Sequence, residues 1–201
     1  MGKNLDHNIY VVNPQCITKD FSTFHIRETG VFKVKKFITD DNDNELFKYS
    51  VSRQSCVLYD NNKIPILNAT VKNNKDMYIY SGQGNNKVLA LLQKNKNSSH
   101  GEQNYTVSYN NLASNQNEII DIIFNKSKKS YTLILNRNKG NESTICSIER
   151  SRKKYSLKVS PSVDYIFMIG INLCLLKLTE IEELETFEST HNELQPSHYQ
   201  F

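Results

Sequence analysis

The sequence predicts a mainly β fold, in which about twelve antiparallel strands close into a barrel around one C-terminal hydrophobic helix. Short runs with strand composition recur along the chain, and polar turn clusters separate them. One apolar stretch, VDYIFMIGINLCLLKL, stands apart from the otherwise polar sequence. No helical pattern interrupts the strand-like runs, which argues against parallel units with crossover helices. A meander that closes on itself is favoured because it leaves no exposed sheet edge.

The expected strands are short runs of β-branched and aromatic residues joined by polar connections such as DDNDNE, DNNK and NRNKGNE, which suit hairpins. An early strand is expected within Ile9–Ile26. The other expected strands are Val31–Ile38, Glu45–Val51, Ser55–Tyr59, Ile64–Val71, Met77–Ser81, Lys87–Gln93, Asn104–Tyr109, Glu118–Phe124, Tyr131–Asn136, Ser143–Glu149 and Lys154–Val159.

The central helix is predicted over residues 161–178. Ser160 suits the N-cap, Pro161 suits the first helical position, and Asp164 lies in the first turn. Lys177 lies near the end of the stretch, where the helix dipole favours a cation.

The apolar run within this helix is too short for a membrane span. From Tyr165 to Leu176 it has only twelve residues, whereas a span needs about 20. A helix that is apolar all round has to be covered on every side. We therefore predict that strands enclose it and fully bury three of its residues, Phe167, Ile171 and Leu175.

Three stretches resemble the LURP-one-related branch of the tubby C-terminal-like superfamily. FITDDNDNELFKYSV is similar to its strand–turn–strand pattern D-x-x-G-N-x-L-F, and VLYDNNKIPILN is similar to L-x-D-x-x-G-x-P-L. YSLKVSPSVDYIFMIGINLCLL is similar to Y-x-V-x-V-x-P-G-x-D followed by a helix. The resemblance covers about residues 10–178. It departs at three turn positions where the family often has Gly, namely Asp43, Lys63 and Ser162.

The resemblance implies the same barrel around a helix, and a non-enzymatic binding module. Tubby domains bind phosphoinositides, scramblase-like relatives associate with membranes, and the LURP-one branch is linked to defence signalling. On this basis we expect a cytoplasmic protein that attaches peripherally to anionic membrane lipids. A protein-interaction or signalling scaffold without a lipid ligand is the alternative. Nucleic acid is disfavoured as a partner because no recognition helix or aromatic–basic motif is present.

Charge is distributed unevenly along the 201 residues, whose net charge is +4. Residues 179–201 contain six Glu and no Lys, Arg or Asp, so the preceding part of the chain is strongly basic. We expect a flexible N-terminus over 1–8, a barrel domain over 9–178 and a disordered acidic tail over 179–201.

The sequence offers no recognisable catalytic or metal-binding pattern. The four Cys lie far apart without a CxxC pair, which is typical of reduced thiols in the cytosol. The loop that begins at Asp40 lacks the Gly and Glu spacing of a calcium loop. GxSxG and HExxH are absent. We therefore expect neither an enzyme, nor a cofactor, nor a metal site.

Alternate turns of a meander lie at opposite ends of the barrel, and one set of turns is basic. This set predicts an anion-binding pole, although lysine-rich turns that serve only solubility would give the same pattern. The candidate lipid-binding residues are Lys126, Lys128, Lys129, Arg150, Arg152, Lys153 and Lys154. Asp40, Asp41, Asp43 and Asp60 are expected at the other end. A helix that threads the barrel should emerge at the basic pole, where the acidic tail could cover it in competition with a ligand.

Overall fold

The computed structural model describes residues 5, 7–30, 34–72, 76–95, 104–151 and 154–192, with the backbone alone for 185–192. Twelve strands precede one long helix, as the sequence predicts. In chain order the elements are η1 (Pro14–Cys16), β1 (Ser22–Thr29), β2 (Lys35–Asp40), β3 (Glu45–Val51), β4 (Ser55–Tyr59), β5 (Pro65–Lys72), β6 (Asp76–Ser81), β7 (Val88–Lys94), β8 (Asn104–Asn111), β9 (Gln116–Asn125), β10 (Ser130–Leu135), β11 (Ser143–Ser151), β12 (Lys154–Val159) and α1 (Tyr165–Asn192).

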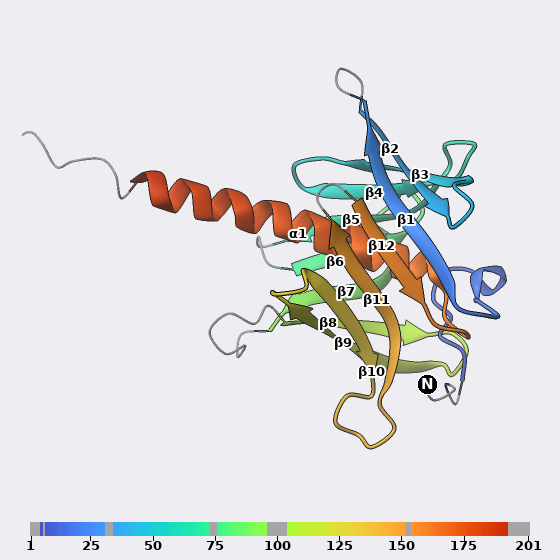
Figure 1. The fold of residues 1–201 in the computed structure, drawn as a ribbon. Coiled ribbons are helices and arrows are strands. Elements are labelled where there is room, and N and C mark those ends of the chain that lie inside the picture. Colours follow the sequence, from blue (N-terminus) through green and yellow to red (C-terminus); the bar gives the residue numbers. More distant parts are fainter. Residues whose placement is uncertain are drawn as a thin grey trace, which may run out of the picture.

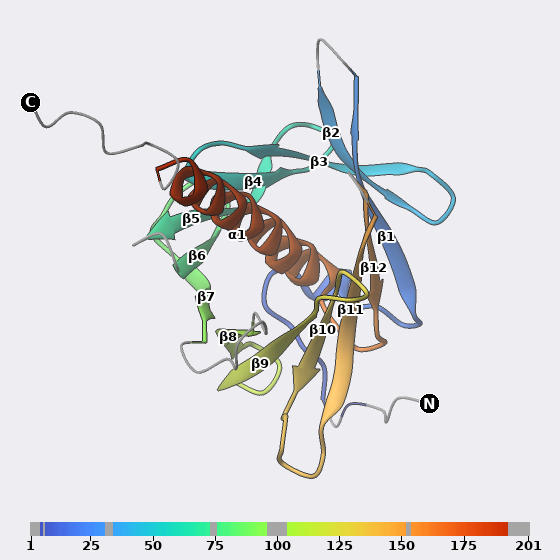
Figure 2. The ribbon, with the colours of Figure 1, turned by 60° about the vertical axis from the view of Figure 1, so that its left-hand side comes forward.

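The strands form a closed antiparallel barrel. Each strand pairs with its neighbours in the chain, and β1 closes the barrel by pairing with β12 in the register Phe24↔Leu157. Side chains alternate between the interior and the surface, most regularly along β8, β10 and β12. Figure 2 shows the strands arranged around α1. The predicted fold class is confirmed.

Helix α1 runs through the barrel and leaves it at one end (Figure 1). Phe167 and Ile171 are 0% exposed and Leu175 is 1% exposed, which confirms the predicted burial. The helix passes close to β5 at Gly170, where a Cβ atom would lie 3.0 Å from the Cδ2 atom of Leu67. Glycine at this position therefore allows the helix and the strand to pack closely.

The helix begins later than the predicted boundary of 161. Ser162 has a φ of 67°, a left-handed conformation that an α-helix does not accommodate, so the helix starts at Tyr165. Asp164 is the N-cap, and its Oδ1 atom accepts a hydrogen bond of 3.2 Å from the Phe167 N–H. The sequence predicts Ser160 at the N-cap and Asp164 in the first turn, whereas in the structure Asp164 itself is the N-cap and lies one residue before the helix.

The helix also ends later than the predicted boundary of 178. It continues to Asn192, so the first part of the tail that was predicted to be disordered is helical. The segment EIEELE consists of good helix formers, and it extends a helix that the buried segment has already nucleated. Residues 193–201 lie outside the described part of the chain.

The N-terminal segment packs against the beginning of α1. Ile9 forms a parallel bridge with Val163, and Ile17 forms an antiparallel bridge with Asp164. The buried Oδ2 atom of Asp164 accepts hydrogen bonds of 2.7–3.2 Å from three consecutive backbone N–H groups, those of Val11, Val12 and Asn13. Burial raises the pKa of Asp164, against the opposing effect of these donors. One carboxyl group thus joins the helix start to the N-terminal segment.

The three turn positions at which the family often has Gly adopt left-handed backbones, with φ values of 63° to 67°. We expect Ser162→Gly to raise the free energy of unfolding by up to about 1 kcal/mol, because it removes the Cβ strain and adds only a smaller unfolded-state entropy cost. Urea denaturation measures this change. Ser160→Gly is the control, and it should destabilise because the Ser160 hydroxyl donates to the Thr144 carbonyl at 2.9 Å. A loss of stability in Ser162→Gly would contradict the strain argument.

Asn172 interrupts the apolar face of α1. Its side chain is 0% exposed, and neither amide atom has a hydrogen-bond partner among the described residues. Since an unpaired buried amide costs about 1–3 kcal/mol, we expect the similarly sized Asn172→Leu to raise the free energy of unfolding by this amount. Asn172→Ala, which also removes the amide but leaves a cavity, should gain much less. A stability loss in the leucine variant, measured by urea denaturation, would show that the amide is satisfied in solution.

Candidate functional site: a basic rim and a lysine-lined pocket

The exit rim is the barrel end at which α1 leaves. In the described part of the chain it carries the turns 52–54 and 126–129 and the strand ends Lys94, Arg150 and Lys154. The strand register places these features together, because Ser130 pairs with Asn125 on one side and with Glu149 on the other, and Ser151 pairs with Lys154. The predicted acidic residues Asp40, Asp41, Asp43 and Asp60 lie at the far end of the barrel.

The predicted basic residues at the exit rim fall into three groups. Lys126, Lys128, Lys129 and Lys154 are exposed and form no ion pair within the described chain. Arg150 is half-buried, and it lies 5.8 Å from the ring of Tyr155. Arg152 and Lys153 lie outside the residues that the structure describes. Five of the seven predicted residues are therefore placed at one end of the barrel.

The β9–β10 turn that carries three of these lysines is fixed by hydrogen bonds. The Asn125 side chain accepts from the Lys128 N–H at 3.1 Å and from the Ser127 hydroxyl at 2.8 Å. The backbone N–H of Arg150 donates to the Lys129 carbonyl at 3.0 Å. The turn is thereby attached to β11, so its ammonium groups and Arg150 occupy one contiguous part of the rim.

Glutamates on the extension of α1 contact this rim. The Glu182 carboxylate lies 2.6 Å from the Lys94 ammonium and accepts from the Tyr105 hydroxyl at 3.2 Å. Glu183 lies 3.1 Å from the Arg150 guanidinium. Burial, together with the nearby Glu182, raises the pKa of Tyr105, so this hydroxyl remains a donor. The Glu183 pair is exposed and the Glu182 pair is only partly buried. Surface pairs contribute about 0–1 kcal/mol each, and the helix therefore covers part of the rim only weakly.

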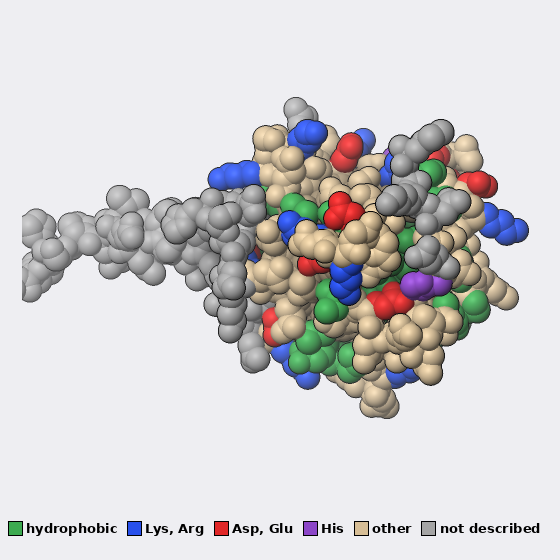
Figure 3. All heavy atoms as spheres, turned by 90° about the horizontal axis from the view of Figure 1, so that it is seen from below, with side chains coloured by type: hydrophobic (Ala, Val, Ile, Leu, Met, Phe, Trp, Pro, Cys, Tyr) green, Lys and Arg blue, Asp and Glu red, His purple; other side chains and the backbone are tan. Residues whose placement is uncertain are grey.

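The face of the molecule that is seen from below the view of Figure 1 carries charges of both signs. Figure 3 shows Lys and Arg side chains scattered among acidic and uncharged ones, without a broad area of one sign. On this face the positive charge is too dispersed to indicate a binding surface.

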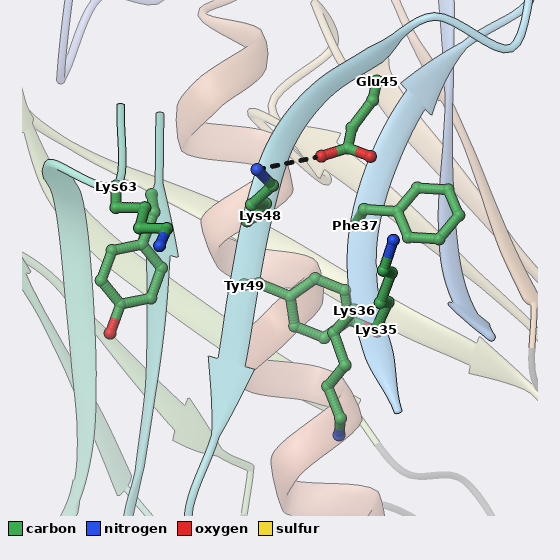
Figure 4. Close-up of a pocket in the computed structure, with 8 residues that line it drawn as sticks. Lys35, Lys36, Phe37, Glu45, Lys48, Tyr49 and Lys63 are labelled. Carbon is green, nitrogen blue, oxygen red and sulfur yellow. Dashed lines mark ion pairs between the residues drawn. The ribbon is translucent and has the colours of Figure 1, made fainter. Parts of the chain in front are cut away.

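A pocket on the flank of the barrel was not predicted from the sequence. It has a volume of about 550 Å³ and is lined by Lys35, Lys36, Phe37, Glu45, Lys48, Tyr49, Tyr59 and Lys63 (Figure 4). The alternation of side chains along β2, β3 and β4 is the signal that could have placed Phe37, Lys48 and Tyr59 on one surface. The pocket itself depends on how two strands diverge, which local composition does not reveal.

Glu118, at the far end of the barrel, is the centre of a structural hydrogen-bond cluster. Glu118 accepts hydrogen bonds from Tyr109 at 2.6 Å, Ser114 at 2.9 Å and Asn111 at 3.0 Å, and it lies 2.8 Å from His7. The pKa of Glu118 is lowered overall, because these hydrogen bonds outweigh the effect of burial, which by itself would raise the pKa. The cluster attaches the N-terminal segment to the β8–β9 hairpin. Among the described residues, no group of three or more His, Cys, Asp or Glu is arranged to hold a metal.

Within the described residues, no helix combines the length and the apolar character that crossing a bilayer requires. The described part of the chain thus combines a closed barrel, filled by its own helix, with a basic exit rim and a flank pocket.

Comparison with known proteins agrees with this architecture. The sequence profile of the LURP-one-related family matches residues 22–176. The chain therefore belongs to the LURP-one-related family, and the predicted tubby C-terminal-like fold is confirmed. The X-ray structure of a protein from Arabidopsis thaliana is similar, with a TM-score of 0.64 and 19% identity over 85% of this chain and 99% of that one. A search of the curated proteins finds no match.

Proposed function

We propose that the protein is a non-enzymatic module that binds anionic phospholipid headgroups, phosphoinositides among them, at a membrane surface through the exit rim. The observation that carries this proposal is the fixed β9–β10 turn, whose three exposed lysines lie beside Lys154 and Arg150. Arg152 and Lys153 connect β11 to β12 and add two positive charges between strand ends that the structure places on this rim. The binding residues in this proposal are the seven predicted from the sequence.

The expected affinity is low and sensitive to salt. Each Lys or Arg near an anionic surface contributes about 1 kcal/mol, so four free lysines supply about 4 kcal/mol. This corresponds to a Kd of about 1 mM for one encounter. Attachment through the rim is therefore reversible, and it weakens as added salt screens the exposed charges.

Sedimentation with vesicles of phosphatidylserine and phosphatidylcholine tests the proposal. The triple variant Lys126→Glu, Lys128→Glu, Lys129→Glu should lose about 100-fold in affinity at low ionic strength, from about 3 kcal/mol of lost attraction. The control Lys19→Glu, Lys87→Glu, Lys139→Glu makes the same charge change at exposed positions of the far end, and it should bind far better than the rim variant. Equal losses in both variants would mean that net charge, not the rim, governs binding.

A further comparison addresses the lipid class. Vesicles in which a phosphoinositide replaces phosphatidylserine at equal total charge should bind at least as tightly if the rim accepts phosphorylated headgroups. Absence of binding to every anionic vesicle would instead favour a protein-interaction scaffold without a lipid ligand.

The α1 glutamates should compete with lipid for the rim. Replacing both carboxylates, in Glu182→Gln with Glu183→Gln, releases Lys94 and Arg150 from their ion pairs. We expect vesicle affinity at low salt to rise about fivefold, which is about 1 kcal/mol. Glu142→Gln with Glu45→Gln removes the same charge at the far end and is the control. Deletion of residues 180–201 should act in the same direction. Unchanged affinity in both the double glutamine variant and the deletion would show that the acidic segment does not cover the rim.

A further inference from the structure

The flank pocket exists because β2 and β3 diverge toward the exit rim. Their pairing includes Phe37↔Lys48, but Lys35 and Lys36 pair only with β1. A register shift between Ile38 and Thr39 accompanies this short pairing. The hairpin of β1 and β2 therefore turns away from β3 and leaves the cavity of about 550 Å³, a volume within the range of about 300–1,000 Å³ for small-molecule sites.

Aromatic side chains form the walls of this pocket. Phe37, Lys48 and Tyr59 are register partners across three adjacent strands, so their side chains form a row on the outer face of the barrel. Tyr49 lies between β2 and β3 (Figure 4). It is held by a hydrogen bond of 3.3 Å to Glu28 and lies 5.8 Å from the Lys36 ammonium. Tyr49 follows Lys48 on β3, so its ring lies on the inner side of the gap and is only 5% exposed. The rings of Phe37 and Tyr59 on the outer face provide the flat surfaces against which another ring can stack.

Lysines surround the aromatic walls, and two of them are available to a ligand. Lys36 pairs with Glu28 at 2.9 Å, and Lys48 pairs with Glu45 at 3.5 Å. Lys35 and Lys63 line the same pocket without an ion pair to any described residue. In Figure 4 they lie on opposite sides of Lys48 and Tyr49. Four ammonium groups against one lining carboxylate give the pocket an excess of positive charge.

The position of Lys63 is set by its turn. Its φ of 65° places it in the left-handed region, and the Lys63 N–H donates to the Asp60 carbonyl at 3.1 Å. The Asp60 side chain also accepts from the Ile64 N–H at 2.7 Å. The side of the pocket that Lys63 forms is therefore part of a defined turn, not of a variable loop.

We propose that this pocket binds a soluble organic phosphate that carries a flat ring, with a nucleoside diphosphate as the representative ligand. The ring stacks against the aromatic walls, and the phosphates lie between Lys35 and Lys63. An inorganic anion would leave the aromatic walls unused, and an uncharged ring would leave the ammonium groups unpaired. This inference goes beyond lipid binding at the exit rim, because the pocket lies on the outer flank of β2–β4.

Isothermal titration calorimetry at low salt with three probes tests this inference. ADP should bind at least about tenfold tighter than either adenosine, which lacks phosphate, or pyrophosphate, which lacks the ring. Absence of ADP binding would overturn the proposal. ADP binding no tighter than pyrophosphate would also overturn it, because the rings would then contribute nothing.

Two sets of variants locate the ADP site. Lys35→Gln with Lys63→Gln should lower the affinity for ADP at least about tenfold. Lys19→Gln with Lys139→Gln removes the same charge outside the pocket and should leave the ADP affinity unchanged. Phe37→Leu keeps an apolar side chain but removes the flat surface. It should therefore lower the affinity for ADP and leave the affinity for pyrophosphate unchanged. Equal ADP affinity in the pocket and control variants would exclude this site. The rim variant Lys126→Glu, Lys128→Glu, Lys129→Glu should bind ADP normally, which separates failure of this proposal from failure of lipid binding.

Discussion

Ile171→Asp is expected to abolish folding. Ile171 is 0% exposed at the middle of the buried part of α1, and strands surround this part of the helix. An unpaired carboxylate there costs several kcal/mol, in addition to the lost burial of the isoleucine. The total is comparable to the 5–15 kcal/mol by which folded domains of this size are usually stable.

Circular dichroism and urea denaturation measure this effect. The control Ile171→Val keeps the site apolar and should cost only about 0.5–1.5 kcal/mol. A cooperative unfolding transition of near wild-type stability in the aspartate variant would show that α1 is not enclosed in solution.

Asp164→Ala is expected to cause the second-largest loss of stability, about 3–5 kcal/mol. The substitution removes the N-cap of α1 and leaves the three N–H donors of residues 11–13 without the carboxylate that they share. Each unsatisfied buried donor costs about 1–3 kcal/mol, and the lost cap adds about 1 kcal/mol. The N–H groups of Val12 and Asn13 are only partly buried and can turn toward water, which keeps the total below the sum.

Urea denaturation gives the free energy of unfolding, and amide hydrogen exchange shows where protection is lost. Exchange should accelerate first in residues 9–18 and at the start of α1, because Asp164 joins these segments. Asp60→Ala removes a carboxyl group from an exposed turn and should cost much less. Equal destabilisation by the two variants would show that Asp164 does not join the N-terminal segment to α1.

The enclosure of the helix could be predicted because it follows from composition alone. The twelve-residue segment from Tyr165 to Leu176 is apolar except for Asn172, so it requires cover on every side. The hairpins predicted from the sequence contain enough strands to provide that cover. Even the left-handed turns at Asp43, Lys63 and Ser162 were marked by a departure from the family pattern. These features depend on local sequence or on a single buried element.

The end of the helix could not be predicted in the same way. EIEELE has no apolar face that demands burial, and its composition suits both a solvated helix and a disordered tail. Whether this segment is helical depends on the preceding buried turns, which nucleate the helix, and on the contacts of Glu182 and Glu183 with the exit rim. Such contacts join residues far apart in the chain.

The flank pocket was missed for a related reason. Lys35, Lys48 and Lys63 belong to three different segments, and only the register of β2, β3 and β4 brings them together. The absence of pairing between β3 and the two residues Lys35 and Lys36, which leaves room for the pocket, has no signature in composition. By contrast, the basic exit rim follows from the alternation of hairpin turns alone, and its placement was therefore predictable.

The central claim is that the exit rim faces the membrane, and a site-specific fluorescence measurement tests it most directly. The four native Cys are buried, so an environment-sensitive fluorophore can be attached at Ser127→Cys on the exit rim or at Asn61→Cys on the far end. Vesicles that contain phosphatidylserine should increase the fluorescence of the label at 127, and a lipid-borne quencher should then reduce it, while the label at 61 stays unchanged. Equal responses at the two positions, or a response at 61 alone, would contradict docking through the exit rim.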